Sequence, residues 1–216
     1  MDGAVAHGTV VHGTVADGPV AAGDGPMVGE MALRARMAEL AGFNELPADR
    51  AVEALTACCA SRRWVSVLAE ARPYPTVADL YHAAAERLRL LAWPDLLEAL
   101  AAHPRIGERA KGESREAAWS RAEQSAAGDA DARTAAALAD ANAAYEEKFG
   151  HVFLIRATGR TASEMLAEAL ARLGHDALAE QAVVRRELGQ IVRLRLDRML
   201  DGLGTKPTAG SGGTAR

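Results

Sequence analysis

Helical signals follow one another along the middle of this chain, and no stretch alternates apolar and polar residues over several positions as a half-buried strand does. Alanine, the best helix former, is very frequent, whereas aromatic residues, which strands favour, make up only 4% of the chain. The length of 216 residues suits one domain with tails. We therefore expect an all-α fold, a single-domain helical bundle with short connections.

Capping residues and glycines mark where the expected helices begin and end. Thr76 and Thr161 each precede an acidic residue by three positions, the spacing of a capping box. Gly150 is expected to end the helix before it in a left-handed conformation, and Gly202 is expected to end the last helix. The pattern predicts helices over about 30–41, 47–60, 76–92, from 94 to just before 103, and over about 114–127, 129–149, 161–173 and 176–201.

Both ends of the chain lack a burial pattern. A His-Gly-Thr-Val sequence that begins at His7 recurs at His12, within a segment rich in glycine, alanine and valine. We expect residues 1–27 to form a flexible, disordered low-complexity tail, and 203–216, rich in glycine, threonine and serine, to form a second one. The helical domain is expected over 28–202.

Charge and motif content exclude several classes of protein. The net charge is −4, which disfavours a nucleic-acid partner, since phosphate-backbone binding needs a basic face. No apolar run reaches the roughly 18 residues of a membrane span, and no secretion signal is recognisable, so we expect a cytoplasmic protein without a membrane partner. Cys58 and Cys59 are adjacent and are expected to be reduced core residues. No zinc or di-iron spacing occurs, and no metal is expected.

Arg195 is the residue that most clearly breaks the helical pattern. At about 100° per residue, Val184, Leu188 and Ile191 share one face of the last helix, and Arg195 lies about 20° from Val184. A charge on an apolar face must be paired or must reach a cavity, because an unpaired buried charge is very costly. Two interpretations stay open: a structural ion pair or snorkelling side chain, and a guanidinium at the floor of a ligand pocket.

Two polar groups could serve a small ligand. Ser120, Glu123 and Gln124 share one helix face and offer a hydroxyl, a carboxylate and an amide, although a solvated face is a common alternative. His103 precedes Pro104, which stiffens the corner that carries an imidazole able to exchange protons near neutral pH. A purely structural histidine remains the alternative.

The apolar run Val152–Ile155 follows the expected helix end at Gly150 and is the best candidate for extended chain. Irregular backbone at this point leaves N–H and C=O groups free to bond a ligand. Otherwise the run is a buried connector.

Taken together, these segments resemble the 2-oxo-4-hydroxy-4-carboxy-5-ureidoimidazoline (OHCU) decarboxylases over about residues 38–201. The matching segments occur in the family's order. They stand here as Phe43-Asn44-Glu45-Leu46-Pro47, His103-Pro104-Arg105-Ile106-Gly107, Ser120-Arg121-Ala122-Glu123-Gln124, Asn142 with Tyr145 to Ile155, and Leu194-Arg195-Leu196.

The resemblance implies a helical lyase of urate degradation that decarboxylates this ureidoimidazoline to (S)-allantoin without metal or organic cofactor, usually as a homodimer. It implies that His103 is the catalytic acid or base and Glu123 its polar partner. It also implies a set of substrate-binding residues: the side chains of Pro104, Ser120, Gln124 and Arg195, and backbone groups of Phe153, Leu154, Ile155, Arg156 and Ala157. The competing hypothesis is a non-catalytic helical interaction protein in which Arg195 and Glu123 form a buried structural pair. A helical DNA-binding regulator is disfavoured by the acidic charge.

Overall fold

The computed structural model describes residues 26–108, 113–128 and 130–204. Every regular element in these ranges is a helix, which confirms the expected all-α fold. No helix among them is long and apolar enough to cross a membrane. In chain order the helices are α1 (Pro26–Asn44), α2 (Ala48–Cys58), α3 (Arg62–Glu70), α4 (Val77–Arg89), α5 (Trp93–Ala101), α6 (Arg115–Glu123), α7 (Ser125–Gly128), α8 (Ala132–Phe149), α9 (Ala162–Arg172) and α10 (Ala177–Gly204).

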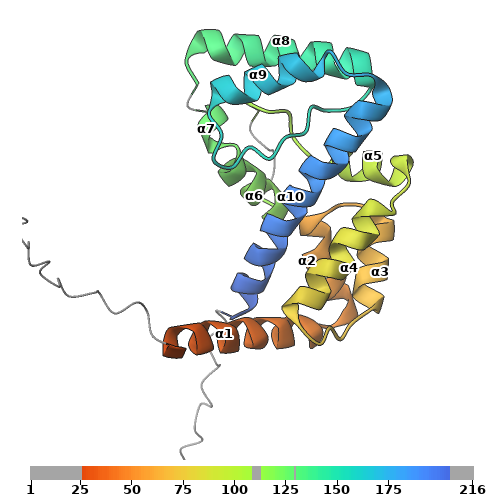
Figure 1. Cartoon of the computed structure of the whole chain (residues 1–216), viewed down its shortest axis with the longest axis vertical. Helices are drawn as coiled ribbons and strands as arrows, with labels where there is room; N and C mark the ends of the chain where they lie inside the picture. The colour runs from red at the N-terminus through yellow and green to blue at the C-terminus, as the bar shows by residue number, and fades with distance from the viewer. Residues whose placement is uncertain (1–25, 109–112, 129, 205–216) are drawn as a thin grey trace, which may run out of the picture.

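The long helix α10 forms the axis of the molecule (Figure 1). It begins beside the pair formed by α8 and α9, passes through the middle of the molecule, and ends against α1. The helices α2 and α4 lie along the part of α10 nearer to α1, and α3 packs against both of them. Two groups of helices therefore share one continuous helix, and a side chain on α10 can reach either group.

Two apolar clusters fill the two groups. The first contains residues of the five helices α1 through α5 and of α10. Its fully buried Trp64 donates from Nε1 to the Ala84 carbonyl oxygen at 3.0 Å. The second joins α8 and α9 and contains Tyr145 and Met165. Since a buried tryptophan N–H needs an acceptor, the bond to Ala84 also fixes how α3 meets α4.

The chain between α8 and α9 runs along the boundary of the two clusters. Leu154 belongs to the first cluster, whereas Phe153, Ile155 and Ala157 belong to the second. Side chains that alternate between two sides are the property of an extended chain. This alternation agrees with the expectation of extended backbone over Val152–Ile155.

The ends of several helices differ from the sequence-based expectation. Gly150 does end α8, with φ of 75°, but the prediction that Gly202 ends the last helix was wrong, because α10 continues to Gly204. The added turn keeps Leu203 against the first cluster, so packing outweighs the helix-breaking tendency of glycine. The expected helix over 114–127 is divided at Gln124.

The segment after Pro47 forms two helices, α2 and α3, where the sequence predicted one. The helix expected over 47–60 ends at Cys58, and α3 was missed. Trp64, Val65 and Leu68 form a buried stripe at helical spacing, which is the signal that identifies α3. The tails expected over 1–27 and 203–216 lie outside the described residues, apart from 26–27 and 203–204, which are helical.

The capping box of α4 gives a test of the helix assignments. Thr76 accepts a hydrogen bond from the Asp79 N–H at 3.1 Å, and the Asp79 carboxylate accepts one from the Thr76 N–H at 3.0 Å. Thr76→Ala should lower the free energy of unfolding by about 1 kcal/mol in equilibrium urea denaturation. Thr56→Ala, on an exposed helix position, is the control and should change it by no more than about 0.5 kcal/mol. Equal effects of the two changes would contradict the capping role.

Candidate active site

All the site residues predicted from the sequence line one small cavity between α6, α10 and the connections before α6 and after α8. The cavity has a volume of about 20 Å³, roughly enough for one water molecule, so a larger ligand requires the surrounding side chains to move apart. Four further residues, which the sequence analysis did not assign to the site, complete the lining: Ile106, Thr158, Ile191 and Leu194.

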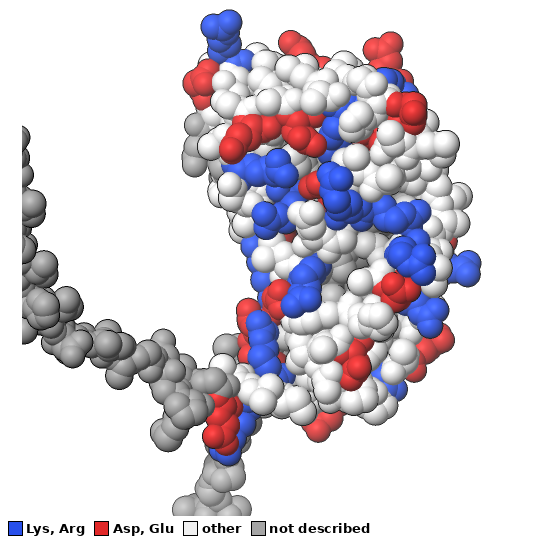
Figure 2. Space-filling view, in the orientation of Figure 1, with Lys and Arg blue, Asp and Glu red and all other residues white. Residues whose placement is uncertain are grey.

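A second, wider hollow lies between α4 and α10. It has a volume of about 890 Å³ and shares only Arg156 and Leu194 with the small cavity. None of His103, Glu123 and Arg195 lines it. The wide hollow is lined by Tyr81, Asp197 and five arginines, and Lys and Arg side chains gather across the middle of the face shown in Figure 2. Among the described residues no histidine lines it, whereas His103 lines the small cavity, which is therefore the candidate site.

His103 is held as a neutral base. Its Nδ1 lies 2.9 Å from the Ala99 carbonyl oxygen, which can only accept, so Nδ1 carries the proton and Nε2 keeps its lone pair. Nε2 is buried and has no hydrogen-bond partner among the described residues. Burial, together with the charge of Arg195, lowers the pKa of His103 to about 4. Ala99 thus orients the ring, and the Glu123 carboxylate contacts Arg195 and Arg198.

The corner that carries His103 is fixed by two amide side chains. The Gln124 side chain accepts from the Gly107 N–H at 3.2 Å and donates to the Pro104 carbonyl oxygen at 3.5 Å. Asn142 on α8 donates to the Ile106 carbonyl oxygen at 2.8 Å. Gly107 adopts φ of 87°, a conformation that residues with a side chain rarely adopt. This conformation allows the chain to turn back tightly. Gln124 therefore supports the corner as well as lining the cavity.

Arg195 lies at the bottom of the site with its charge compensated. It is only 1% exposed, and its Nε and Nη2 contact the Glu123 carboxylate oxygens at 3.2 and 2.9 Å. Nη2 also donates to the Ser120 hydroxyl at 3.0 Å, and Arg198 reaches Glu123 at 2.8 Å. Both interpretations of Arg195 hold in part: it forms a buried ion pair and it lines the cavity.

A second carboxylate approaches the same guanidinium. An oxygen of Glu116 lies 3.6 Å from Arg195 Nη1 and has no hydrogen-bond partner among the described residues. Burial raises the pKa of Glu116 above its ordinary value, although the neighbouring Arg195 opposes the rise. Within the described residues no group of three or more His, Cys, Asp and Glu side chains is placed to hold a metal ion.

The extended segment Phe153–Ala157 lines the cavity. In extended chain, the N–H and C=O of one residue point to the same edge, and those of the next residue point to the opposite edge. Leu154 C=O and Arg156 N–H are bonded to side chains of α9 and α10. The N–H and C=O of Ile155 have no partner among the described residues, and Ile155 lines the cavity. This edge can pair with a ligand that offers an amide-like donor and acceptor side by side.

The ion pair beneath the cavity gives the second prediction. Arg195→Met removes the doubly bonded partner of a buried carboxylate and should lower the free energy of unfolding by about 3–5 kcal/mol. Adding Glu123→Leu should restore at least about 1 kcal/mol of that loss, because it removes a buried carboxylate that would keep only Arg198 as a partner. Arg50→Met, which removes an exposed pair with Glu53, is the control and should cost at most about 1 kcal/mol. Strictly additive single and double changes would show that the two residues do not interact.

The chain is similar to known proteins. The family model described as OHCU decarboxylase matches residues 44–197. A curated relative, the uric acid degradation bifunctional protein TTL of Arabidopsis thaliana, is 30% identical over 146 residues, which are 66% of this chain and 45% of the relative. This chain thus spans less than half of that relative's length.

Two solved structures share the fold. One is an OHCU decarboxylase crystallised in the presence of (S)-allantoin, with a TM-score of 0.61 and 28% identity, over 69% of this chain and 98% of that one. The other is an (S)-allantoin synthase, with a TM-score of 0.57 and 17% identity, over 75% of this chain and 54% of that one, and it supports the fold alone. From the family match over residues 44–197, the chain belongs to the OHCU decarboxylase family.

Proposed function

We propose that this protein decarboxylates 2-oxo-4-hydroxy-4-carboxy-5-ureidoimidazoline to (S)-allantoin in urate degradation. The single observation that carries the proposal is the state of His103, a buried neutral imidazole with an unpartnered Nε2 at a cavity lined by Arg195 and a free backbone edge. A proton acceptor, a guanidinium and paired amide-like groups suit a small ligand rich in nitrogen and oxygen. Membership of the family supports the same substrate.

The substrate itself can accept the electron pair that is released when CO2 leaves. The carbon that carries its carboxylate also carries a hydroxyl group and adjoins a C=N bond. When the bond to the carboxylate breaks and CO2 leaves, the electron pair forms a C=C bond and the C=N pair moves onto nitrogen, which takes up a proton. The resulting enol loses its hydroxyl proton and the neighbouring carbon gains one, which gives the C=O and C–H of allantoin. We therefore propose that no organic cofactor or metal is needed.

The protein's part is to position the substrate, exclude water and move a proton. His103 Nε2 accepts the hydroxyl proton, since its lone pair is available and Nδ1 is already committed to Ala99. Proton return from one side of the ring sets the configuration of the product. Arg195 offers an N–H fork to a carboxylate or carbonyl edge, and Glu123, through two contacts with Arg195, fixes the direction of that fork.

A coupled assay tests this proposal directly. Urate is oxidised and hydrolysed by the upstream enzymes, the protein is added, and circular dichroism follows the appearance of chiral allantoin. His103→Asn should lower turnover by about 10²–10⁴-fold while the fold survives, because a general acid or base is lost. His82→Asn, on the exposed face of α4, is the control and should leave turnover unchanged. No enhancement by the wild-type protein would favour the non-catalytic interaction protein.

The pKa of His103 gives a dependence on pH. Because its neutral form is the base and burial lowers its pKa to about 4, kcat/KM should stay level through pH 6.5 and fall only near pH 4. The unfolded chain binds the proton near pH 6.5, so the free energy of unfolding should decrease as pH falls from 6.5 towards 4. His103→Asn should flatten that decrease in denaturation curves. An acid limb of kcat/KM at pH 6.5 would contradict a buried neutral His103.

We also propose that the protein is a cytoplasmic homodimer. The family resemblance supports the dimer, and two free, buried cysteines, Cys58 and Cys59, suit a reducing compartment. Light scattering after size exclusion tests the dimer, and fractionation of cells with an antibody tests the compartment.

A further inference from the structure

We propose that Glu187 and Arg172 are positioning residues for catalysis. They hold one backbone edge of the extended segment Phe153–Ala157, so that its opposite edge is presented to the substrate. This inference rests on the proposed function, since it concerns the same site. Neither residue lines the small cavity, and both are buried charged side chains on the helices that follow the segment.

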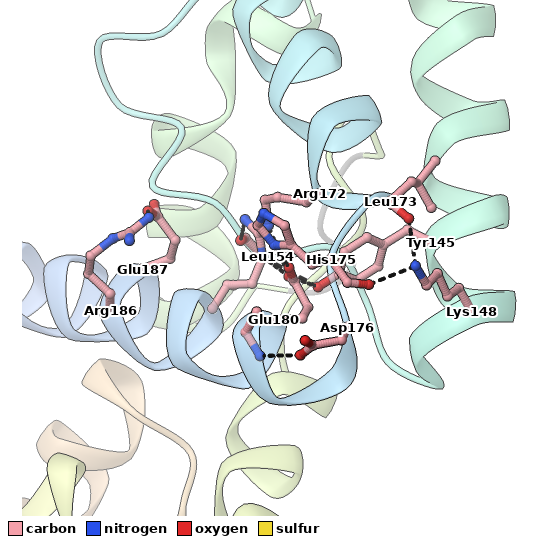
Figure 3. A network of polar contacts seen from close by, with 11 residues as sticks. Tyr145, Lys148, Leu154, Arg172, Leu173, His175, Asp176, Glu180, Arg186 and Glu187 are labelled. Carbon is pink, nitrogen blue, oxygen red and sulfur yellow. Dashed lines mark hydrogen bonds and ion pairs between the residues drawn. The ribbon is translucent and has the colours of Figure 1, made fainter.

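Arg172, at the end of α9, holds the Leu154 carbonyl group. Its Nη1 donates to that oxygen at 2.8 Å (Figure 3). Its guanidinium carbon also lies 4.7 Å from the centre of the Phe153 ring. Two neighbouring residues of the segment are thus fixed by one side chain, one through the backbone and one through the ring.

The position of Arg172 is in turn fixed from α8 and α10. Its Nε and Nη2 donate to a Glu180 carboxylate oxygen, the former at 2.9 Å, and Tyr145 of α8 donates its hydroxyl to the same carboxylate (Figure 3). Burial pushes the pKa of Glu180 upwards, but hydrogen bonds from Arg172, Tyr145 and His175 outweigh it and leave the pKa below its ordinary value. The carboxylate is therefore ionised at neutral pH and restrains the guanidinium.

Glu187 binds the next backbone group on the same edge, the N–H of Arg156. Its Oε2 accepts from the Arg156 N–H at 3.0 Å, and its Oε1 accepts from Arg186 at 3.2 Å. Glu187 is 2% exposed, so its carboxylate has left water for these bonds. Leu154 and Arg156 are two residues apart, and in extended chain their backbone groups share one edge.

The two anchors determine where the free edge lies. Bonds at Leu154 C=O and Arg156 N–H bracket Ile155, whose own N–H and C=O have no partner among the described residues. With both neighbours fixed, the Ile155 peptide groups can neither rotate nor slide by a residue without breaking a buried bond. Ligand binding then costs less ordering of the segment, which favours affinity. Purely structural anchors would stabilise the fold without changing how the folded protein binds ligand.

Variants at Glu187 separate positioning from stability. Glu187→Gln keeps an oxygen at the place of Oε2 and can still accept from Arg156 N–H. Glu187→Met has a similar length and no acceptor. We expect Glu187→Met to raise KM, and the Kd for (S)-allantoin measured by calorimetry on folded protein, by roughly ten-fold or more, because a small misplacement at a site has large effects. Glu187→Gln should stay within about three-fold of wild type for both quantities.

The pH profile and a distant control complete the test. The acid limb of kcat/KM should keep its wild-type position in Glu187→Met, because His103 is untouched. Glu39→Met, which removes a partly buried carboxylate paired with Arg36 on α1, should leave KM and Kd unchanged. If Glu187→Met does not fold, Glu187→Asp replaces it, since its shorter side chain withdraws the acceptor while the charge stays, and the same rise in KM and Kd is expected.

The outcomes distinguish this inference from the proposed function. Suppose that the wild-type protein forms allantoin, and that a folded Glu187→Met or Glu187→Asp variant has the same KM and Kd as the wild type. That result would overturn the positioning role alone. A wild-type protein that neither forms allantoin nor binds it would overturn the proposed function, and the positioning role with it.

Discussion

The buried ion pair between Arg195 of α10 and Glu123 of α6 is the interaction on which the geometry of the site depends. It joins the axial helix to the short helix that also carries Ser120 and, at its end, Gln124. Gln124 holds the corner after His103, so the imidazole is located relative to Arg195 through this pair. Three charged contacts join α6 to α10: Arg195 with Glu123, Arg198 with Glu123, and Arg195 with Glu116. Two of the three depend on Arg195, which defines the floor of the cavity.

The same helix organises the rest of the site through two more buried charges. Glu180, Glu187 and Arg195 follow one another along α10, roughly 10 and 12 Å apart, and lie within about 80° of one another around the helix axis. Glu180 restrains Arg172, and Glu187 bonds the Arg156 N–H, while Arg195 meets α6. One rigid element thus sets the relative positions of the backbone edge and the guanidinium, which is more precise than placing both on loops.

The sequence allowed much of this to be predicted, for physical reasons that differ between parts of the site. Arg195 was recognisable because a cation on an apolar face must have a partner. Glu180 and Glu187 lie within about 60° of Val184 on that same face, so their positions carried the same signal. Their burial was overlooked because glutamate near arginines usually marks a solvated helix face. Arg172 gave no such signal, since a basic residue in the last turn of a helix is favourable without any tertiary contact.

Backbone chemistry is the part that sequence reasoning could reach least. His103 is oriented by the backbone carbonyl group of Ala99 and not by Glu123. Every residue has such a carbonyl group, so no pattern of side chains predicts this contact. The sequence likewise does not predict which backbone edge is free at Ile155. Side-chain alternation predicts extended chain, but only the partners at Leu154 and Arg156 determine which edge remains available.

The three buried charges on α10 are weak evidence for stability, since apolar side chains of similar volume often stabilise a fold as well as a buried ion pair does. What apolar packing lacks is direction, because dispersion contacts tolerate small rotations and shifts of a helix that a hydrogen-bonded charge does not. A rotation of α10 by one residue, about 100°, would move Glu187 away from the Arg156 N–H and Arg195 away from Glu123 at the same time. Both would then be buried charges without partners, which costs several kcal/mol each. The polar anchors therefore select one register of α10 against its neighbours, and the register that they select is the one that brings the guanidinium, the imidazole corner and the free backbone edge to one cavity.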